Sequence, residues 1–241
     1  MGTVVGTQII QRVMRTLNDS SNVRWTLGEL LDWLNDAQRE IAILRPDSST
    51  AVAPIPLVAG TTLQSLPTTP INATRLIDVI RNLGTDGATP GAPIRLVARE
   101  ELDQYRPSWH TDTASAAIKN YVYDGRSPRV FYVYPRPATT TNVEAHMAVV
   151  PTDVTMDGVN GGTADSAIAL DDVYQTALYD FVVFRALSKN TDAKNDQEAV
   201  RSYQAFLNRL GLKLQADRAF DPHRNAPPQE PKRAGNADTA L

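Results

Sequence analysis

Apolar residues recur at helical spacing near both ends of this chain. In residues 26–45 they follow one another at steps of three and four, which predicts an amphipathic helix. Thr26 and Glu29 form a Thr-x-x-Glu capping box at its start, and Pro46 ends it. A shorter stripe of the same period predicts another helix over residues 7–18.

The helical period returns in the last third of the chain. Residues 173–188 are apolar on nearly all sides, which predicts a helix at the centre of a bundle. Asp171 and Asp172 stand where N-terminal caps are favoured. A further stripe predicts a last helix over residues 193–217. The apolar stripes at the two ends of the chain need a common surface, so we expect the four helices to form one antiparallel bundle.

The middle of the chain has the period and the turn residues of a β-region. Short extended segments follow one another from about residue 50, and residues 142–150 alternate between apolar and polar positions. Asp124–Pro128 reads as the loop of a hairpin, and a short helix is expected at Arg99–Tyr105. Residues 151–166 are rich in glycine and aspartate and predict a long loop. We expect a small antiparallel β-domain.

The predicted fold class is therefore α+β, with a helical bundle from both chain ends, a central β-rich insertion and an extended C-terminal tail. The predicted domains are a discontinuous bundle of residues 1–49 and 166–217, an insertion of residues 50–165, and a tail of residues 218–241.

The tail has too few apolar residues to fold alone. Four of the 16 prolines lie in its last 20 residues, and they favour an extended chain. Its large apolar side chains are Phe220 and Leu241, and its cations after Arg218 are Arg224, Lys232 and Arg233. We predict that these five residues make an arm that binds a partner.

Composition narrows the function classes. The net charge of −3 argues against a strongly basic protein that grips nucleic acid. With no cysteine, the chain can form neither disulfides nor thiolate metal sites. No apolar run approaches the ~20 residues of a membrane span, and no secretory signal is visible at the N-terminus. We expect a protein made in the cytoplasm, without a membrane anchor.

Candidate chemistry is sparse. The glycine-rich loops Gly84–Gly91 and Gly158–Gly162 lack the Gly-Lys-Ser/Thr ending of a phosphate-binding loop. The three histidines, His110, His146 and His223, lie far apart, so neither a metal site nor a cofactor is expected. Aromatic residues of the predicted hairpin have few basic neighbours, which favours sheet packing over base stacking.

Carboxylates are the remaining candidates for catalysis, because glycoside hydrolysis needs only a pair of them. Two groups stand close in sequence, and both also suit helix N-termini: Glu100, Glu101 and Asp103, and Asp171 and Asp172. No serine lies in a Gly-x-Ser-x-Gly frame. We therefore expect no enzymatic activity, and no catalytic, cofactor-binding or metal-binding residues.

A family resemblance covers roughly residues 7–135. It rests on the segment from Trp25 to Ile41 followed by Leu44-Arg-Pro-Asp47, on Leu76–Asn82, and on a set of single positions: Arg99, Leu102, Asp103, Pro107 and Trp109. These residues resemble the head-to-tail adaptor, or connector, proteins of tailed bacteriophages, of the tail-tubular-protein-A-like kind. The turn at Gly60–Pro67 departs from the pattern, and only the helical pattern matches in the last third.

The resemblance implies a structural virion protein at the portal vertex. Such adaptors form homo-oligomeric rings, typically of twelve subunits, between the portal protein and a downstream tail or nozzle protein. Double-stranded DNA passes through the ring without sequence-specific contact when the genome is ejected, and an acidic chain suits that passage. Assembly would occur in the host cytoplasm. Two alternatives stay open: a virion-associated peptidoglycan hydrolase that uses two of the carboxylates above, and a non-viral scaffold-type interaction protein.

Overall fold

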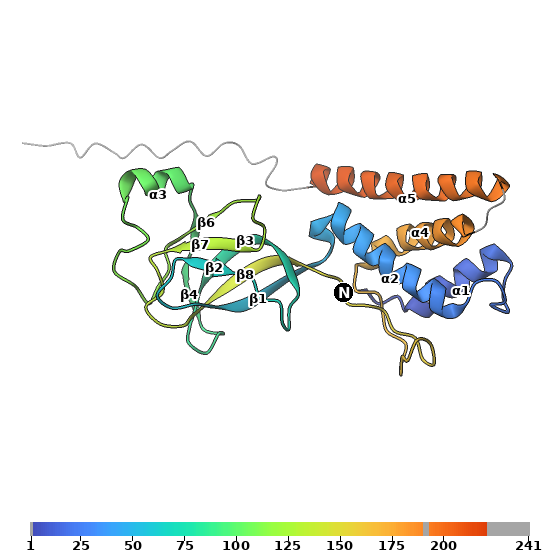
Figure 1. Cartoon of the computed structure of the whole chain (residues 1–241), viewed down its shortest axis with the longest axis horizontal. Coiled ribbons are helices and arrows are strands. Elements are labelled where there is room, and N and C mark those ends of the chain that lie inside the picture. Colours follow the sequence, from blue (N-terminus) through green and yellow to red (C-terminus); the bar gives the residue numbers. More distant parts are fainter. Residues whose placement is uncertain (1, 190–192, 221–241) are drawn as a thin grey trace, which may run out of the picture.

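The computed structural model describes residues 2–189 and 193–220, with the backbone alone at 193–195 and 220. Two domains lie next to each other along its long axis, one helical and one built of β-strands (Figure 1). The N-terminus lies between them. The helical domain contains both ends of the described chain, and the β-domain is inserted between its second and third long helices, which confirms the predicted α+β architecture.

In the described part of the chain, the helical domain has four long helices: α1 (Gly6–Leu17), α2 (Leu27–Leu44), α4 (Gln175–Ser188) and α5 (Ala193–Phe220). A short 3-10 turn, η2 (Asp172–Tyr174), precedes α4. Helix α4 packs against α1, α2 and α5, and most of its residues from Ala177 to Ala186 are buried. This central position confirms the prediction made from its nearly continuous apolar sequence.

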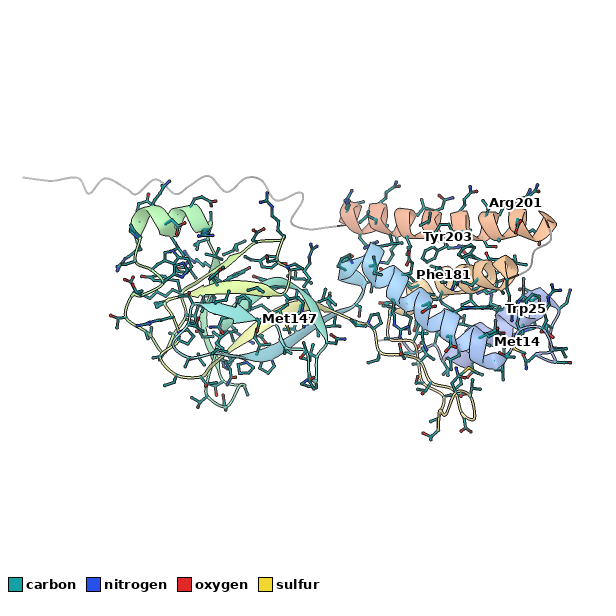
Figure 2. All side chains as sticks on the ribbon, viewed as in Figure 1. Met14, Trp25, Met147, Phe181, Arg201 and Tyr203 are labelled. Carbon is teal, nitrogen blue, oxygen red and sulfur yellow. The ribbon has the colours of Figure 1, made fainter. Side chains whose placement is uncertain are left out.

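Aromatic side chains join α5 to α4. Phe181 and Phe184 of α4 lie 5.2 and 4.8 Å, centroid to centroid, from Phe206 and Tyr203 of α5. Figure 2 shows Phe181 and Tyr203 in the layer between these two helices. Tilted and edge-on aromatic pairs of this kind stabilise a contact beyond the area that they bury.

The predicted caps are present, with one difference. Glu29 N donates to Thr26 Oγ1 over 3.3 Å and Thr26 N donates to Glu29 Oε2 over 3.2 Å, which is the predicted capping box. Asp171 accepts a hydrogen bond from Val173 N, as a cap should. Asp172 instead accepts hydrogen bonds from the backbone of Thr3 and Val4, so it holds the N-terminal segment against the start of η2.

The β-domain is a sandwich of two four-stranded sheets. The first has the order β1 (Thr50–Leu57), β8 (Thr141–Val149), β3 (Ala73–Leu83), β4 (Pro90–Pro93). The second has the order β2 (Leu63–Ser65), β7 (Val130–Tyr134), β6 (Asn120–Tyr123), β5 (Arg95–Leu96). The 3-10 turn η1 (Pro46–Ser48) joins α2 to β1, and α3 (Arg99–Tyr105) follows β5.

Apolar side chains from the inner faces of both sheets fill the sandwich. The first sheet supplies Leu76, Val79 and Met147, the last of which Figure 2 shows inside the domain, and the second supplies Phe131 and Val133. Alternation along β8 buries Val143, Ala145 and Met147 as expected, because successive side chains of a strand point to opposite faces.

Two features of the β-domain differ from the antiparallel scheme predicted. β5 pairs in parallel with β6, because the chain returns to this sheet through α3 rather than through a hairpin. β3 pairs with β8 through three register shifts, so its buried residues Ala73, Leu76, Val79 and Asn82 recur every third position. The extra residues of the bulges stay exposed, among them Ile77 and Ile80.

One buried asparagine in each domain ties separate segments together. Asn35 of α2 donates to the Val154 carbonyl over 3.1 Å and accepts from Val154 N over 2.7 Å. Asn82 of β3 donates to the Ile118 carbonyl over 2.7 Å and accepts from Ile118 N over 2.8 Å. Each amide side chain satisfies backbone groups that would otherwise be buried without partners.

The last helix is longer than predicted. α5 continues through Phe220, so residues 218–220, which were expected to begin the extended tail, are its final residues. The predicted partner-binding residues Arg224, Lys232, Arg233 and Leu241 lie outside the described residues, as does the side chain of Phe220.

Candidate functional surfaces

The structure separates the two carboxylate groups that could have formed a catalytic pair. Glu100, Glu101 and Asp103 lie on α3 of the β-domain, whereas Asp171 and Asp172 begin the second half of the helical domain. No residue of one group therefore faces a residue of the other. A catalytic pair would have to come from within one group.

One carboxylate of each group, Asp103 and Asp172, makes structural contacts within its own domain. Asp103 accepts from the Trp109 indole N–H over 2.8 Å and pairs with Arg99 at 3.3 Å. The hydroxyl of Thr3 and the backbone of Val4 hold the pKa of the Asp172 carboxyl below its ordinary value. A lowered pKa keeps that group ionised and accepting, which is opposite to what a general acid needs.

The histidines are equally separate. His110 stacks on Trp109 with ring centroids 3.6 Å apart, and its Nδ1 lies 2.8 Å from the Thr62 hydroxyl oxygen. His146 lies on β8 on the face turned away from the core, and His223 is outside the described residues. Among the described residues, no three metal-binding side chains come together.

The aromatic residues of the β6–β7 hairpin are packing residues, as predicted. Tyr121 and Phe131 are buried in the core of the sandwich. Tyr132 and Tyr134 lie on the opposite side of the second sheet, where they pack against Trp109 and Leu102. Their rings are partly buried against protein, which favours packing over an open stacking platform for bases.

A charged cluster fixes the end of α5 beside the junction of the two domains. The Arg45 side chain is buried at the end of α2 and lies 2.6 Å from Asp47 and 2.7 Å from Asp217. Lys213 also contacts Asp217 at 2.7 Å. The Lys213 ammonium and the Arg45 guanidinium lower the pKa of the Asp217 carboxyl, and Arg45 lowers the pKa of Asp47. These contacts thus hold the C-terminal end of α5 in a defined position.

Beside the same junction, an apolar groove of about 400 Å³ separates α2 from the first sheet. Its walls are mainly aliphatic and proline residues: Ala42, Ile43, Pro46, Pro128, Val149 and Pro151. Arg39 and Arg75 also line it. Sequence reasoning missed this groove, because its residues come from segments that are adjacent only in the folded chain.

The outer face of the first sheet is a second exposed apolar surface. Val52 of β1 is 54 % exposed, and Ile77 and Ile80 of β3 are 40 % and 37 % exposed. Since the inner face of this sheet is filled by the core, these side chains mark its outer face. The exposure of the bulge residues Ile77 and Ile80 could not be predicted from the sequence, because a bulge breaks the two-residue alternation of a strand.

No helix of the part of the chain described here has the length and hydropathy needed to cross a membrane. Comparison with known proteins gives one family. The model of the family described as SU10 adaptor protein matches residues 6–227. None of the curated proteins matches the chain.

Proposed function

Because the chain belongs to the SU10 adaptor protein family, we propose that it forms the ring that joins the portal to the tail of a bacteriophage and lines the DNA exit channel. The family match is the observation that carries this proposal, since residues 6–227 include both domains and all described helices. Membership indicates a phage adaptor with a structural rather than an enzymatic role, and a place in the virion among other virion proteins.

The finer parts of the proposal follow from the resemblance to phage head-to-tail adaptors. The ring is homo-oligomeric, of twelve subunits and of the tail-tubular-protein-A-like kind. It binds the portal on one side and a tail or nozzle protein on the other. The exposed apolar surfaces support this role, because a chain that works alone gains nothing from leaving them uncovered.

We assign the DNA contact to weak, sequence-independent interactions. The net charge of −3 gives the chain little general attraction for phosphate, which would let the genome slide through the ring. Duplex binding by the purified chain at physiological salt should therefore fall far short of the nanomolar range of specific binders. Nanomolar affinity would contradict this assignment.

Residues 218–241 form the portal-binding arm in this proposal. Residues 218–220 continue α5 as its root, and the arm carries Phe220, Arg224, Lys232, Arg233 and Leu241 as its anchors. Its root is held at Asp217 by Arg45 and Lys213, so each subunit presents the arm from the same place. Charge pairs at the rim of such a contact contribute about 0.2–1 kcal/mol each, and the ring repeats them.

Deletion of residues 221–241 tests the arm and leaves α5 intact. The shortened chain should fold with an unchanged thermal midpoint but should not be retained by immobilised portal rings. The matched control replaces Arg224, Lys232 and Arg233 by glutamine in the full chain, which should weaken retention without abolishing it. Full retention of the shortened chain would show that the arm is elsewhere.

Mass photometry of the purified chain mixed with portal rings tests the function itself. We expect a complex whose mass equals one portal ring plus a closed ring of this chain. A matched mixture with an unrelated ring protein should leave the chain unbound. If no complex with the portal forms at any ratio, the chain is not a portal adaptor.

A further inference from the structure

The two outer faces of the β-sandwich differ in what covers them. The outer face of the second sheet packs against α3 and the Trp109 loop, through Val122, Tyr132 and Leu102. Figure 1 shows α3 on the side of the sandwich that β6 and β7 occupy, away from β1. The outer face of the first sheet has no such helix among the described residues, and we call it the bare face. It exposes Val52, Ile77 and Ile80.

We propose that α3 of one copy docks on the bare face of the next copy, an inference that rests on the ring proposed above. The two surfaces lie on opposite sides of one domain, so the contact is head-to-tail rather than two-fold. A head-to-tail contact gives a ring when its rotation closes after a whole number of copies, and an open filament when it does not. Each subunit would use α3 toward one neighbour and its bare face toward the other.

Tyr105 is the protruding side chain that α3 contributes to this contact. It is the last residue of α3, and 84 % of its side chain is exposed. Tyrosine is among the residues that contribute most to protein interfaces, because it buries a large rigid ring and keeps a polar tip. Tyr105 is not needed to hold α3 to its own domain, because Leu102 makes that contact.

The distance between a charged and an apolar residue is similar on α3 and on the bare face. Glu101 and Tyr105 are four residues apart on α3 and so lie on one side of it, about 6 Å apart along the helix. Arg75 and Ile77 are two residues apart on β3, about 6.6 Å along the strand. Placing Tyr105 on Ile77 therefore brings Glu101 to Arg75.

The charges of these residues are complementary, and Arg75 contacts Tyr123 rather than a carboxylate. Glu100 and Glu101 are exposed on α3 and make no ion pair within the part of the chain described. Arg75 is exposed at the edge of the bare face and has no ion pair among those residues either. A carboxylate facing a guanidinium fixes the register of a contact more than it strengthens it.

A protein partner suits the bare face better than DNA does. Strands β3 and β8 carry two arginines and two carboxylates, and Arg81 is already paired with Glu144 at 2.6 Å. Phosphate binding needs a surplus of cations, which this face lacks. Main-chain pairing at the sheet edges is also disfavoured, because Pro54 and Pro56 lie on β1 and Pro90 and Pro93 bound β4.

The area of the bare face is large enough for only part of a stable interface. Four strands of this length present on the order of 400 Å² on one face, given strands about 4.8 Å apart and 3.3 Å per residue. A stable interface takes about 800 Å² from each partner. The groove between α2 and the first sheet continues the bare face at Arg75 and Val149, and it can supply part of the remainder.

Charge placed on the bare face tests the contact. Ile77→Asp with Ile80→Asp changes only exposed side chains, so the chain should fold normally. Assembly into rings on the portal should need a protein concentration higher by about 30-fold or more, as expected when the centre of an interface is lost. Val23→Asp is the matched control, because Val23 is 85 % exposed on a loop of the helical domain.

Cysteine pairs test the geometry directly, since the chain has no cysteine of its own. Tyr105→Cys is combined in turn with Val52→Cys, Ile77→Cys and Ile80→Cys. Oxidation of assembled rings should link copies into a ladder that extends beyond dimers for at least one pair. A single cysteine can link two copies at most, and the control pair Val23→Cys with Ile77→Cys should give no ladder.

The outcomes separate this inference from the function on which it rests. Rings that form normally with both aspartates and give no ladder would overturn the α3 contact and leave the adaptor role intact. Failure of the unmodified chain to form rings with its portal would overturn both. If deletion of residues 221–241 from the monomer speeds hydrogen exchange in residues 73–83, the chain's own tail covers the bare face, and the inference is wrong.

Discussion

The helical domain is closed by contacts between segments far apart in the chain, whereas the β-sandwich is formed by one continuous stretch. Asn35 of α2 reaches Val154, 119 residues later, and Trp25 donates its indole N–H to the Ala186 carbonyl. Asn82, by contrast, reaches Ile118 within the same domain. The sandwich can complete its core without the helices, but the helical domain cannot close before the chain returns to it.

This difference would suit the proposed adaptor, whose arm and ring contact are assigned to different domains. The proposed arm would follow α5 of the helical domain, while the bare face and α3 belong to the sandwich. Arg45 and Asp47 lie in the short segment that joins the two, and Asp217 ties the end of α5 to that segment.

Truncating one buried phenylalanine in each domain should give the largest effect and the sharpest contrast. Phe206 is fully buried between α5 and α4, and Phe131 is 1 % exposed in the sandwich. Either change to alanine should cost about 3–5 kcal/mol of unfolding free energy, because it leaves a cavity. Hydrogen exchange should show Phe206→Ala loosening α5 and Phe131→Ala loosening β6 and β7. Equal loosening of both domains by both variants would contradict their independence.

Replacing each buried asparagine by leucine should give the next largest effect. The change leaves a backbone N–H and a carbonyl buried without partners, at a cost of about 2–3 kcal/mol. Asn35→Leu should release residues 152–156 from α2, and Asn82→Leu should release residues 116–119 from β3. Denaturant unfolding gives the cost, and exchange at these two segments locates it. A loss below 0.5 kcal/mol, far under the desolvation cost of such groups, would mean that neither amide anchors its domain.

The cluster at the junction should give the smallest effect, and one that depends on pH. The pKa of Asp217 is lowered by Lys213 and Arg45, so its contribution is complete above the unfolded-state value and is lost as pH falls through the folded-state value. We expect the end of α5 to loosen below about pH 4, the ordinary range of an aspartate.

Asp217→Asn serves as the variant for that prediction. It should destabilise the chain by about 1 kcal/mol or less at neutral pH, since Asp217 is more than one third exposed. It should also flatten the dependence of stability on pH below about pH 4 relative to the unmodified chain, because the Asp217 contribution is complete above the ordinary aspartate pKa. An unchanged pH profile in the variant would show that other carboxylates control acid unfolding.

Local patterns explain why so much of the fold could be predicted. The start of α2 follows from Thr26 and Glu29, and its end follows from Pro46, because these signals lie within the element itself. The bounds predicted for α3 and for the β6–β7 hairpin also agree with the structure within a residue. The pairing partners of the strands could not be read in this way, and the parallel pair of β5 and β6 was missed.

The surfaces proposed for function were the least predictable part. Ile77 and Ile80 are exposed only because bulges shift β3 against β8, and a bulge leaves no mark in a strand pattern. The groove needs α2, β3, β8 and the β6–β7 loop together. Asp172, expected as a cap, binds Thr3 because the N-terminal segment passes over it in the folded chain. Such contacts depend on topology, which one sequence does not specify.

Electron cryomicroscopy of the intact phage particle would show directly whether this chain forms a ring at the portal vertex. We predict a closed ring of this chain between the portal and the tail, around the channel through which DNA passes, with α3 of each copy against the bare face of the next. If density for the chain is absent from the portal vertex, or if it lies there as separate copies that do not form a ring, the account is wrong.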